Sequence, residues 1–448
     1  MPSVVWFRRD LRLTDHPALC EAVASDDGIV PLFVLDPALL GPAGGPRVAF
    51  MLACLRSLDT DLDGDLVVRT GDPADVVPAL AREVEASAVY TSADFNPYGR
   101  RRDEKVADAL GDVPLQPTGS PYAISPGRIR KPDGEPYRVY TPYYRAWREH
   151  GYPRPAPRPD RITTVSGLRS DPLPPAPDIG DTALPQAGEQ EALRRWADFR
   201  DERLLSYADD RNRPDIPSTS RLSAYLRWGC IHPRTPLADL SGRTGKGAEV
   251  FRKELAWREF YADVLLHQPD SAREHLQPRY ARLEVDAGKS ADERFTAWTE
   301  GRTGYPIVDA GMRQLRAEAW IHNRIRMVVA SFLIKDLHLG WKEGARHFMR
   351  HLVDGDLASN QHGWQWVAGS GTDASPFYRV FNPVKQGQKF DPDGDYVRRY
   401  VPELRKVEGA AVHTPWELPE QPAGYPAPIV AHDEERREAL ERYEAVKG

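Results

Sequence analysis

The sequence predicts an α/β domain followed by a mostly helical one. Residues 1–119 alternate short apolar runs with helical stretches, the pattern of a parallel sheet covered by helices on both faces. From residue 189 onward, apolar residues recur at helical spacing. Nine prolines from Pro153 to Pro185 favour an extended connector between the two patterns. We therefore expect an α/β domain with a parallel, Rossmann-like five-stranded sheet (residues 1–130), a proline-rich linker (131–190) and a helical domain (191–448).

Five apolar runs are the predicted parallel strands of the first domain: residues 4–7, 29–36, 66–72, 88–95 and 115–119. Ligands of such sheets bind beyond the carboxyl ends of the strands. The charged stretches FRRDLRLTD, FVLDP and SADFNPYGRRRD lie at three of these ends. No GxGxxG follows the first strand, so an ordinary dinucleotide site is not indicated. The three loops predict either a ligand pocket or, as is commoner, solvated loop ends.

Composition excludes several classes of protein. With 41% hydrophobic and 28% charged residues, the chain is typical of soluble globular proteins, and no apolar run approaches the roughly 20 residues of a membrane span. No export signal precedes the first predicted strand, so we expect a cytoplasmic protein, and a monomer. The three cysteines, Cys20, Cys54 and Cys230, lie far apart, which argues against a disulfide framework or a metal site and favours core thiols.

The charge of the chain is uneven. The net charge of -6 speaks against indiscriminate attraction to nucleic acid. Residues 311–350, however, hold eight Lys or Arg against three Asp or Glu. Such an excess is more often a solvated helix face than a phosphate-binding surface.

The stretch from Trp298 to Trp366 combines five tryptophans, a basic helix and the acidic turn DGD. Its helix is predicted to be buried through apolar residues at helical spacing, which are Ile325, Val328, Val329, Phe332, Leu333 and Leu337. Burying the arginines near it is costly unless carboxylates or phosphates meet them. We therefore expect an ion pair or a bound ligand here, with Asp354 and Asp356 as the nearest concentrated carboxylates.

Two other stretches could carry chemistry. TSRLS, residues 219–223, places hydroxyl groups at the expected start of a helix, where anions bind, although such a cluster is most often a simple cap. In KELAWREFYADVLL, one helix face carries Glu254, Trp257, Arg258 and Tyr261. An Arg–Glu pair beside aromatic core would explain this face, yet aromatic planes beside a carboxylate also suit a flipped nucleobase.

Together, TSRLS, ELAWREFY, TGYPIVDAGMRQL, WIHNRIRM and DGDLASNQHGWQW closely resemble the photolyase/cryptochrome flavoproteins, in particular the bacterial class I cyclobutane pyrimidine dimer photolyases. The resemblance runs from FRRDLRL to about FNPVKQGQKF, and five long motifs in the family's order are a specific signal. It implies a helical domain that holds a folded FAD and a light-driven enzyme that acts on ultraviolet-damaged DNA.

The resemblance assigns the FAD site residue by residue. The pyrophosphate and ribitol region would be held by Tyr207, Thr219, Ser220, Arg221, Leu222 and Ser223. Arg326 and Asp354 would form an ion pair beside the isoalloxazine, Asp356 would meet the adenine and the ring side, and Asn360 would face flavin N5. Gly355 and Trp257 complete the predicted set. An amide at position 360 favours repair enzymes over plant-type receptors, which tend to carry Asp.

The resemblance also assigns the chemistry. Trp364, Trp341 and Trp298 match the family's electron-transfer chain from flavin to surface. Glu254 would hydrogen-bond the dimer, Trp257 and Trp366 would wall it, and Asn323 would add a polar contact. An electron from excited reduced FAD would split the cyclobutane ring and then return. The DNA strand would be held by Arg211, Arg258, Tyr261, Arg324, Arg379 and Gln386. Repair of 6-4 photoproducts is disfavoured, because Asn323 and Met327 stand where that branch places histidines.

A second, light-harvesting chromophore is expected in the N-terminal domain. Folate-binding members present an Asn-Glu pair where this chain has Tyr98 and Gly99. DFNPYGRRRD instead resembles members that bind 8-hydroxy-5-deazaflavin, with Asp36, Arg47, Asp94 and Tyr98 as the candidate residues. Two alternatives to the repair enzyme stay open: a cryptochrome-type blue-light receptor that signals through a partner protein, and a DNA-binding flavoprotein without photochemistry.

Overall fold

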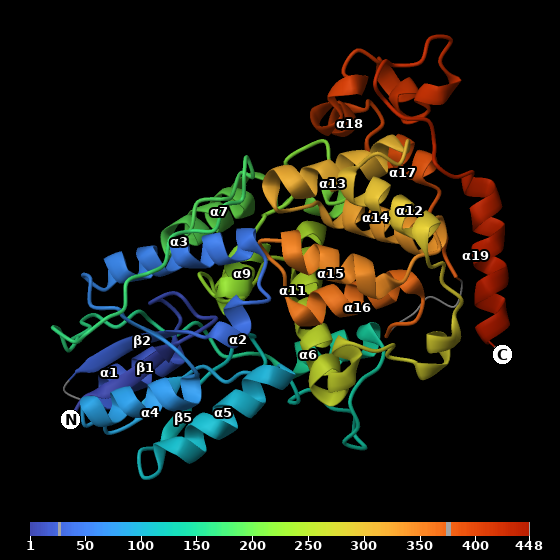
Figure 1. Ribbon diagram of the computed structural model, residues 1–448. Helices are drawn as coiled ribbons and strands as arrows, with labels where there is room; N and C mark the ends of the chain where they lie inside the picture. Colours follow the sequence, from blue (N-terminus) through green and yellow to red (C-terminus); the bar gives the residue numbers. More distant parts are fainter. Residues whose placement is uncertain (26–27, 373–377, 448) are drawn as a thin grey trace. The chain divides into compact units, whose positions relative to one another are not determined.

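The computed structural model describes residues 1–25, 28–372 and 378–447, which form two compact units (Figure 1). The first unit comprises residues 1–179, 185–205 and 220–269. The second comprises residues 180–184, 206–219 and 270–448. The two units are discontinuous in sequence and differ from the three predicted segments. The predicted boundaries at residues 130 and 190 therefore stay predictions.

The first unit is built on a sheet of five parallel strands in the order β3-β2-β1-β4-β5. The strands are β1 (Ser3–Phe7), β2 (Ile29–Leu35), β3 (Val67–Thr70), β4 (Val89–Thr91) and β5 (Leu115–Pro117). All five lie at the predicted apolar runs, which confirms the α/β fold. Val4 of β1 lies opposite Val30 and Val89, and alternate residues of this face pack on α4 (Pro73–Glu83) and α5 (Pro97–Leu110).

Three strands lead into helices through the same local device, an Asp or Asn followed by Pro. Asp36, Asp72 and Asn96 are the N-caps of α2 (Pro37–Leu40), α4 and α5, and each accepts a hydrogen bond from a backbone N–H of its helix. Proline at the first helical position lacks only an N–H that would have no helical partner. These caps fix polar side chains at the carboxyl edge of the sheet.

The remaining helices of the first unit are α1 (Pro17–Ser25), α3 (Gly45–Asp61), α6 (Tyr140–His150), α7 (Glu189–Glu202), α9 (Ser223–Trp228), α10 (Arg234–Asp239) and α11 (Lys246–His267). Helix α6 lies inside the segment predicted as a linker, and this helix was not predicted from the sequence. Its aromatic residues explain the difference, because Tyr143 and Trp147 are buried against α11. The buried Glu259 of α11 accepts the Trp147 Nε1–H at 2.6 Å and the amides of Ala123 and Ile124, and burial raises its pKa to about 7.

The proline-rich segment after α6 follows one edge of the sheet without forming a helix between residues 151 and 188. Thr164 pairs with Ile29 in a parallel bridge beside β2. At the outer strand β3, Ser170 Oγ and the Asp171 carboxylate accept the backbone N–H groups of Val68 and Thr70, at 2.9 and 2.8 Å. The predicted extended connector is therefore bonded to the sheet.

The described part of the second unit is helical. Its α-helices are α8 (Tyr207–Asp210), α12 (Lys289–Glu300), α13 (Pro306–Glu318), α14 (Asn323–Lys335), α15 (Trp341–His351), α16 (Leu357–Ala368), α17 (Pro383–Phe390), α18 (Asp395–Tyr400) and α19 (His432–Lys447). Short 3-10 helices are η1 (Pro269–Ala272, which begins at the last residue of the first unit), η2 (Pro278–Arg282), η3 (Pro402–Leu404), η4 (Gly409–His413) and η5 (Pro415–Glu417). The expected mostly helical second domain is confirmed.

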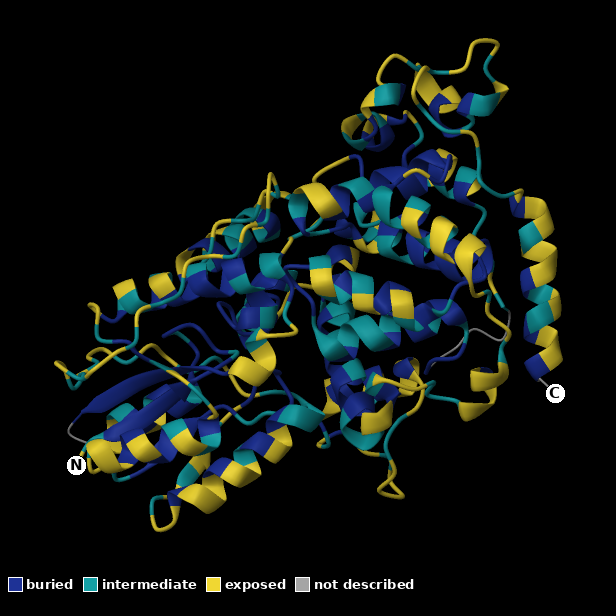
Figure 2. Ribbon diagram, in the orientation of Figure 1, coloured by how far each residue is buried: buried dark blue, intermediate teal, exposed yellow. Residues whose placement is uncertain are grey.

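Helix α14 forms the centre of this unit. The six apolar residues predicted to bury it are all at most 1% exposed, and most of its ribbon is drawn as buried (Figure 2). They join a single core with Trp298, Trp341 and Trp364 from the three helices around it. The charged groups near α14 therefore lie beside an apolar interior, as the sequence predicts.

The structure also tests what the sequence predicted for the cysteines and for membrane-spanning helices. Cys54 and Cys230 are buried free thiols whose sulfur atoms lie 3.5 Å apart, and Cys20 is half-buried. The expected core thiols are thus confirmed for two of the three. Among the helices of the described residues, we find none that combines the length and the apolar character of a bilayer span.

Candidate functional site

The DGD turn brings a carboxylate to the basic helix α14. Asp354 lies in the turn before α16, and its Oδ2 accepts a hydrogen bond from the Arg326 guanidinium at 2.7 Å. Arg326 Nε also donates to the Ile321 carbonyl. The other carboxylate oxygen, Asp354 Oδ1, is buried without a hydrogen-bond partner. The ion pair expected from the sequence is present, and one buried acceptor is left available for a ligand.

Helix α16 begins at this turn. Asp356 is its N-cap, with Oδ1 accepting the Ser359 N–H at 3.0 Å, so this carboxylate already has a structural role. One turn later, Asn360 Nδ2 donates to the Ala345 carbonyl at 3.1 Å and to Gln361. The amide nitrogen is committed by these bonds, so Asn360 presents its oxygen as an acceptor.

Two arginines predicted to bind DNA lie close together in the second unit. Arg324 on α14 donates through Nη2 to Asn212 Oδ1 at 2.8 Å and stacks on Phe390. Burial and the neighbouring charge of Arg211 lower the pKa of Arg324. Two like charges held near each other favour a bound anion such as a phosphate.

The other predicted DNA contacts of this unit are placed on different elements. Asn323 is the exposed first residue of α14. Arg379 is exposed before α17, and its carbonyl accepts a hydrogen bond from the buried Lys335. Gln386 is half-buried on α17 with its side-chain oxygen unbonded. Trp366 is half-buried on α16, near Tyr378 and Arg379. Their roles on DNA stay predictions.

Helix α11 in the first unit carries the predicted stripe, with all four side chains half-buried. Trp257 stacks on Tyr140 of α6, with ring centroids 3.6 Å apart and planes 10° apart. Glu254 and Tyr261 flank it on the same face. A rigid aromatic wall beside a carboxylate is the arrangement that the sequence predicts.

Arg258 also has contacts within its own unit, and its predicted role on DNA stays a prediction. Its guanidinium donates to the carbonyls of Pro121 and Leu226, at 2.9 and 3.1 Å, and lies over the Tyr122 ring. The sequence places Arg258 beside Glu254 on the stripe but does not reveal these carbonyls. The structure gives Arg258 the role of holding α11 to two neighbouring segments of its own unit.

The TSRLS stretch ends at a helix start, as expected. Helix α9 begins at Ser223, Leu222 is buried, and Ser220 Oγ accepts the Leu222 N–H at 3.4 Å. Arg221 has a positive φ of 51°, which is uncommon for a residue with a side chain. Ser220 to Ser223 belong to the first unit, whereas Thr219 and the buried Tyr207 belong to the second.

The three tryptophans of the predicted electron chain do not form the expected order. Trp298 is 0% exposed, and its ring lies 6.2 Å from that of Trp364 and is stacked on Phe348. Its Nε1–H donates to the Val329 carbonyl at 3.0 Å. The prediction that Trp298 is the surface end of the chain is therefore wrong. Trp341 is held separately, with Nε1 donating to His275 Nε2 at 3.3 Å.

Of the candidate antenna residues, Asp36 and Arg47 are buried, whereas Asp94 and Tyr98 are half-buried. Asp36 Oδ2 accepts the Tyr98 hydroxyl hydrogen, and burial together with this carboxylate raises the pKa of Tyr98. Asp94 pairs with Arg102 at 3.3 Å, while Arg47 is buried on α3. The prediction of solvated loop ends is wrong here, because the three loops form a buried polar network.

Sequence reasoning missed the residues that complete this network. Arg8 pairs with Asp103, and Arg8 and Arg102 lie over the Trp6 ring, at 4.6 and 5.0 Å. Asp10 accepts the Ser92 hydroxyl hydrogen and lies 3.3 Å from His16. For Arg8, Asp10 and Ser92 the available signal was a position just after β1 or β4, whereas Arg102 and Asp103 lie within α5.

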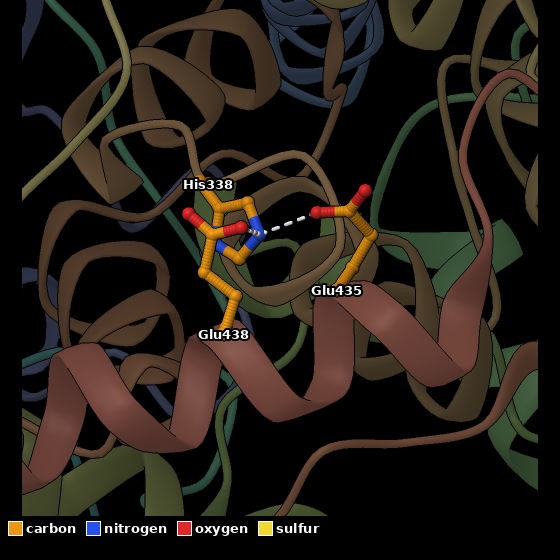
Figure 3. Close-up of side chains that lie close together, drawn as sticks. All are labelled: His338, Glu435 and Glu438. Carbon is orange, nitrogen blue, oxygen red and sulfur yellow. Dashed lines mark hydrogen bonds and ion pairs between the residues drawn. The ribbon is translucent and has the colours of Figure 1, made fainter.

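One further group has metal-like spacing. His338, in the turn before α15, faces Glu435 and Glu438 of α19, with Nε2 at 2.7 and 4.0 Å from their Oε2 atoms (Figure 3). A His–Glu ion pair explains the shorter contact, so this group serves to tie α19 to the α14–α15 turn.

These features define a class. An α/β unit with parallel strands accompanies a helical unit whose core holds a buried acidic turn, an arginine and an amide acceptor. This is the combination that the resemblance to the photolyase/cryptochrome flavoproteins implies, in which the helical part holds the flavin nucleotide.

Comparison with known proteins identifies the family. Residues 3–160 match the DNA photolyase family, and residues 251–445 match the FAD binding domain of DNA photolyase. The chain is 40% identical, over all of its length and 99% of theirs, to proteins named deoxyribodipyrimidine photo-lyase from Halobacterium salinarum and Streptomyces griseus. The chain belongs to the photolyase/cryptochrome family and carries its FAD-binding domain.

Solved structures agree on the fold. A class III photolyase from Agrobacterium tumefaciens has a TM-score of 0.92 at 38% identity and covers 100% of this chain and 98% of its own. An archaeal photolyase from Sulfolobus tokodaii with two FAD molecules has a TM-score of 0.85 at 29% identity, covering 99% of this chain and 100% of its own. A Synechocystis cryptochrome has a TM-score of 0.90 at 26% identity and covers 98% of each chain.

Proposed function

We propose that this chain repairs cyclobutane pyrimidine dimers in DNA by a light-driven electron transfer that uses FAD. The observation that carries the proposal is the buried, unpartnered Asp354 Oδ1 beside Arg326, in a chain that belongs to the photolyase family. Full-length relatives named deoxyribodipyrimidine photo-lyase support the same reaction.

The residues present fit a flavin nucleotide. Asp354 Oδ1 offers an acceptor to a ring N–H, and Asn360 offers a second through its amide oxygen. Arg326 holds the Asp354 carboxylate in place and supplies positive charge beside it. When bound, FAD supplies an electron donor that absorbs blue light.

For the lesion, the proposal keeps the roles that the family resemblance assigns. The half-buried Glu254 would hydrogen-bond the dimer, and Trp257, braced by Tyr140, would offer a flat surface to its rings. Asn323 and Trp366 would add a polar contact and a second wall. Arg211 and Arg324 would bind phosphates of the damaged strand. Flipping a dimer out of the duplex costs less energy than flipping an intact base.

The test is a repair assay on purified protein whose FAD has been reduced chemically. A dimer-containing oligonucleotide should lose its dimers under blue light and keep them in the dark. Glu254→Gln should slow repair at saturating DNA, whereas Glu202→Gln, at an exposed site on α7, should leave it unchanged. Persistence of the dimers under light, with reduced FAD present, would contradict the proposal.

A cryptochrome-type receptor is the second candidate, supported by the fold shared with the Synechocystis protein. Such a receptor would change its affinity for a partner protein under light while dimers persist. The repair assay, run beside a light-dependent pull-down, separates the two functions.

We also infer that the first unit binds a second chromophore, 8-hydroxy-5-deazaflavin, near Asp36, Arg47, Asp94 and Tyr98. The buried polar network at this sheet edge supports a ligand there, although a folate or a second flavin fits the same role. Mass spectrometry of the chromophores extracted from the purified protein decides among them. Membership of class I, a monomeric state and a cytoplasmic location stay predictions. Sedimentation velocity tests the monomeric state.

A further inference from the structure

A cavity of about 280 Å³ lies in the second unit, beside a tryptophan of the predicted electron chain. Its walls come from the segment after η2, the end of α14, the start of α15 and one face of α19. Leu283, Ile334 and Leu339 give it an apolar interior, and the charged side chains Lys342, Arg346 and Arg442 also line it. A volume of this size accommodates a molecule of one or two rings.

Trp341 lies on the wall of this cavity, together with His275. The indole is only 3% exposed, and its N–H is held by His275 Nε2. Burial and the charge of Lys342 lower the pKa of His275, which keeps the imidazole neutral and able to accept this hydrogen bond. Trp341 thus combines a buried, fixed ring with an adjoining space open to a small molecule.

Trp298 cannot supply the outer end of the chain, because it is fully buried against Trp364 and Phe348. An electron that moves inward from Trp341 must be replaced from outside the protein. We propose that the cavity beside Trp341, here named the Trp341 cavity, binds a small planar organic reductant, a hydroquinone or enediol, which returns that electron.

This inference rests on the proposed function and on the electron chain that the resemblance implies, in which Trp341 passes an electron inward toward Trp364. The oxidised indole then takes one electron from the reductant and is restored. The reductant is oxidised by one electron and releases one hydroxyl proton to water. Each turnover of the cavity therefore consumes one electron from the reductant, and no bond to the protein forms.

The lining selects the chemistry of the reductant. The apolar walls and the rings of Trp341 and Tyr378 suit a flat ring. Arg442 is committed to Asp286 at 2.8 Å and Lys342 to Glu274 at 2.7 Å. Among the described residues, Arg346 has no ion-pair partner, so it is available to an acidic substituent of the ligand. Glu284 and Glu343 also line the cavity and would weaken a second negative charge.

The wall formed by α19 is fixed rather than loosely attached. The ion pair of His338 with Glu435 joins this helix to the turn that precedes Trp341 (Figure 3). Tyr443 of the same helix donates to or accepts from the Tyr280 hydroxyl at 2.9 Å. Two bonds at separate points hold the cavity open in one shape, which favours binding of a preformed ligand.

The test measures binding and electron supply separately. Hydroquinone sulfonate is titrated into the FAD-containing protein in the dark by calorimetry. In parallel, the rate of light-driven reduction of the oxidised protein is recorded against the concentration of the same reductant. We expect a binding isotherm and a rate that saturates at matching concentrations.

The variant that fills the cavity is Ala281→Phe, since Ala281 is exposed at the lining and phenylalanine is not oxidised under these conditions. It should weaken binding at least tenfold and raise the half-saturating concentration by the same factor. Ala287→Phe, an exposed residue that the cavity lining does not include, is the matched control and should change neither. Arg346→Gln should weaken the binding of hydroquinone sulfonate more than the binding of unsubstituted hydroquinone.

A rate that rises linearly with reductant and is the same in Ala281→Phe would overturn the inference, as would the absence of binding heat. Failure of the proposed function gives a different result, because it is read from dimer repair by chemically reduced protein, which needs no external electron. Repair with normal yield together with unsaturable photoreduction would reject the cavity alone.

Discussion

Asp354 shows how one residue can indicate a bound ligand. One of its oxygens is paired with Arg326, and the other is buried without a partner. A buried acceptor without a hydrogen bond is unfavourable by about 1–3 kcal/mol, so its retention points to a group that completes it. The sequence indicated the pair through buried arginines beside the DGD turn, but it could not show which oxygen is left over.

Replacing Asp354 by Asn should reduce FAD retention and stability together. The neutral amide leaves Arg326 without its counter-charge, and because that side chain is 26% exposed we expect a loss of about 2 kcal/mol, below the roughly 3–5 kcal/mol of a fully buried pair. The flavin-to-protein absorbance ratio and urea unfolding measure the two effects. Glu300→Gln, which breaks an exposed pair with Arg302, is the control and should change neither.

Lys335 should make stability depend on alkaline pH. It is buried, with Nζ bonded to the Arg379 carbonyl, and burial lowers its pKa from 10.5 to about 7. Between these values the unfolded chain binds a proton that the folded chain does not, so the free energy of unfolding rises with pH, by up to about 1.4 kcal/mol per unit.

Urea unfolding between pH 7 and 10 checks the effect of Lys335. Lys335→Met should lose this part of the slope and be more stable at pH 7. Lys289→Met, at an exposed lysine, should keep the slope of the parent protein. Equal slopes for the parent and Lys335→Met would show that Lys335 keeps its charge in the folded state.

At the scale of helices and strands, the periodicity of apolar residues predicted those elements that pack on a core. The five strands and the buried face of α14 follow from apolar spacing, because each side of these elements packs on a core. Helix α6 was missed because flanking prolines suggested a linker, and its aromatic residues are buried partly through α11, which is distant in sequence. The surface end of the tryptophan chain was also missed, because spacing places Trp298 on α12 but not the direction in which its ring points.

The packing of α15 on α16 is tight enough to exclude one methyl group. A Cβ on Gly344 would lie 2.1 Å from the Trp364 ring. Gly344→Ala should therefore destabilise by about 1–3 kcal/mol through overpacking, despite a gain of about 1 kcal/mol in helix propensity. Thermal unfolding followed by circular dichroism measures the balance.

Gly363 on α16 offers the matched control for Gly344. A Cβ there meets nothing within 4 Å, so Gly363→Ala should stabilise by about 0.5–1 kcal/mol. If both variants are stabilised, the Trp364 ring moves more easily than its burial suggests.

For the molecule as a whole, the net charge of -6 requires local arginines for any affinity to DNA. Arg211 and Arg324 are held near each other, whereas Arg258 is committed to carbonyls of its own unit. The family resemblance named all three as DNA contacts, but it does not show which carbonyls each guanidinium meets within this chain.

The salt dependence of binding to damaged DNA separates these arginines. Arg324→Gln should reduce the slope of log K against log salt by about 1, as expected for one lost phosphate contact. Arg258→Gln should leave the slope unchanged while lowering thermal stability. Fluorescence anisotropy with a dimer-containing oligonucleotide at several salt concentrations measures both. An equal fall in slope for the two variants would show that Arg258 contacts a DNA phosphate as Arg324 does.

The bonded connector along β3 has a consequence for solubility. An outer strand with unpaired amides can recruit a strand from another molecule and start aggregation. Here Ser170 and Asp171 occupy the amides of Val68 and Thr70, so this border of the sheet offers no template for intermolecular pairing. A segment rich in proline, which has few backbone N–H groups to offer a further strand, thus protects the molecule from self-association while it links the elements on either side.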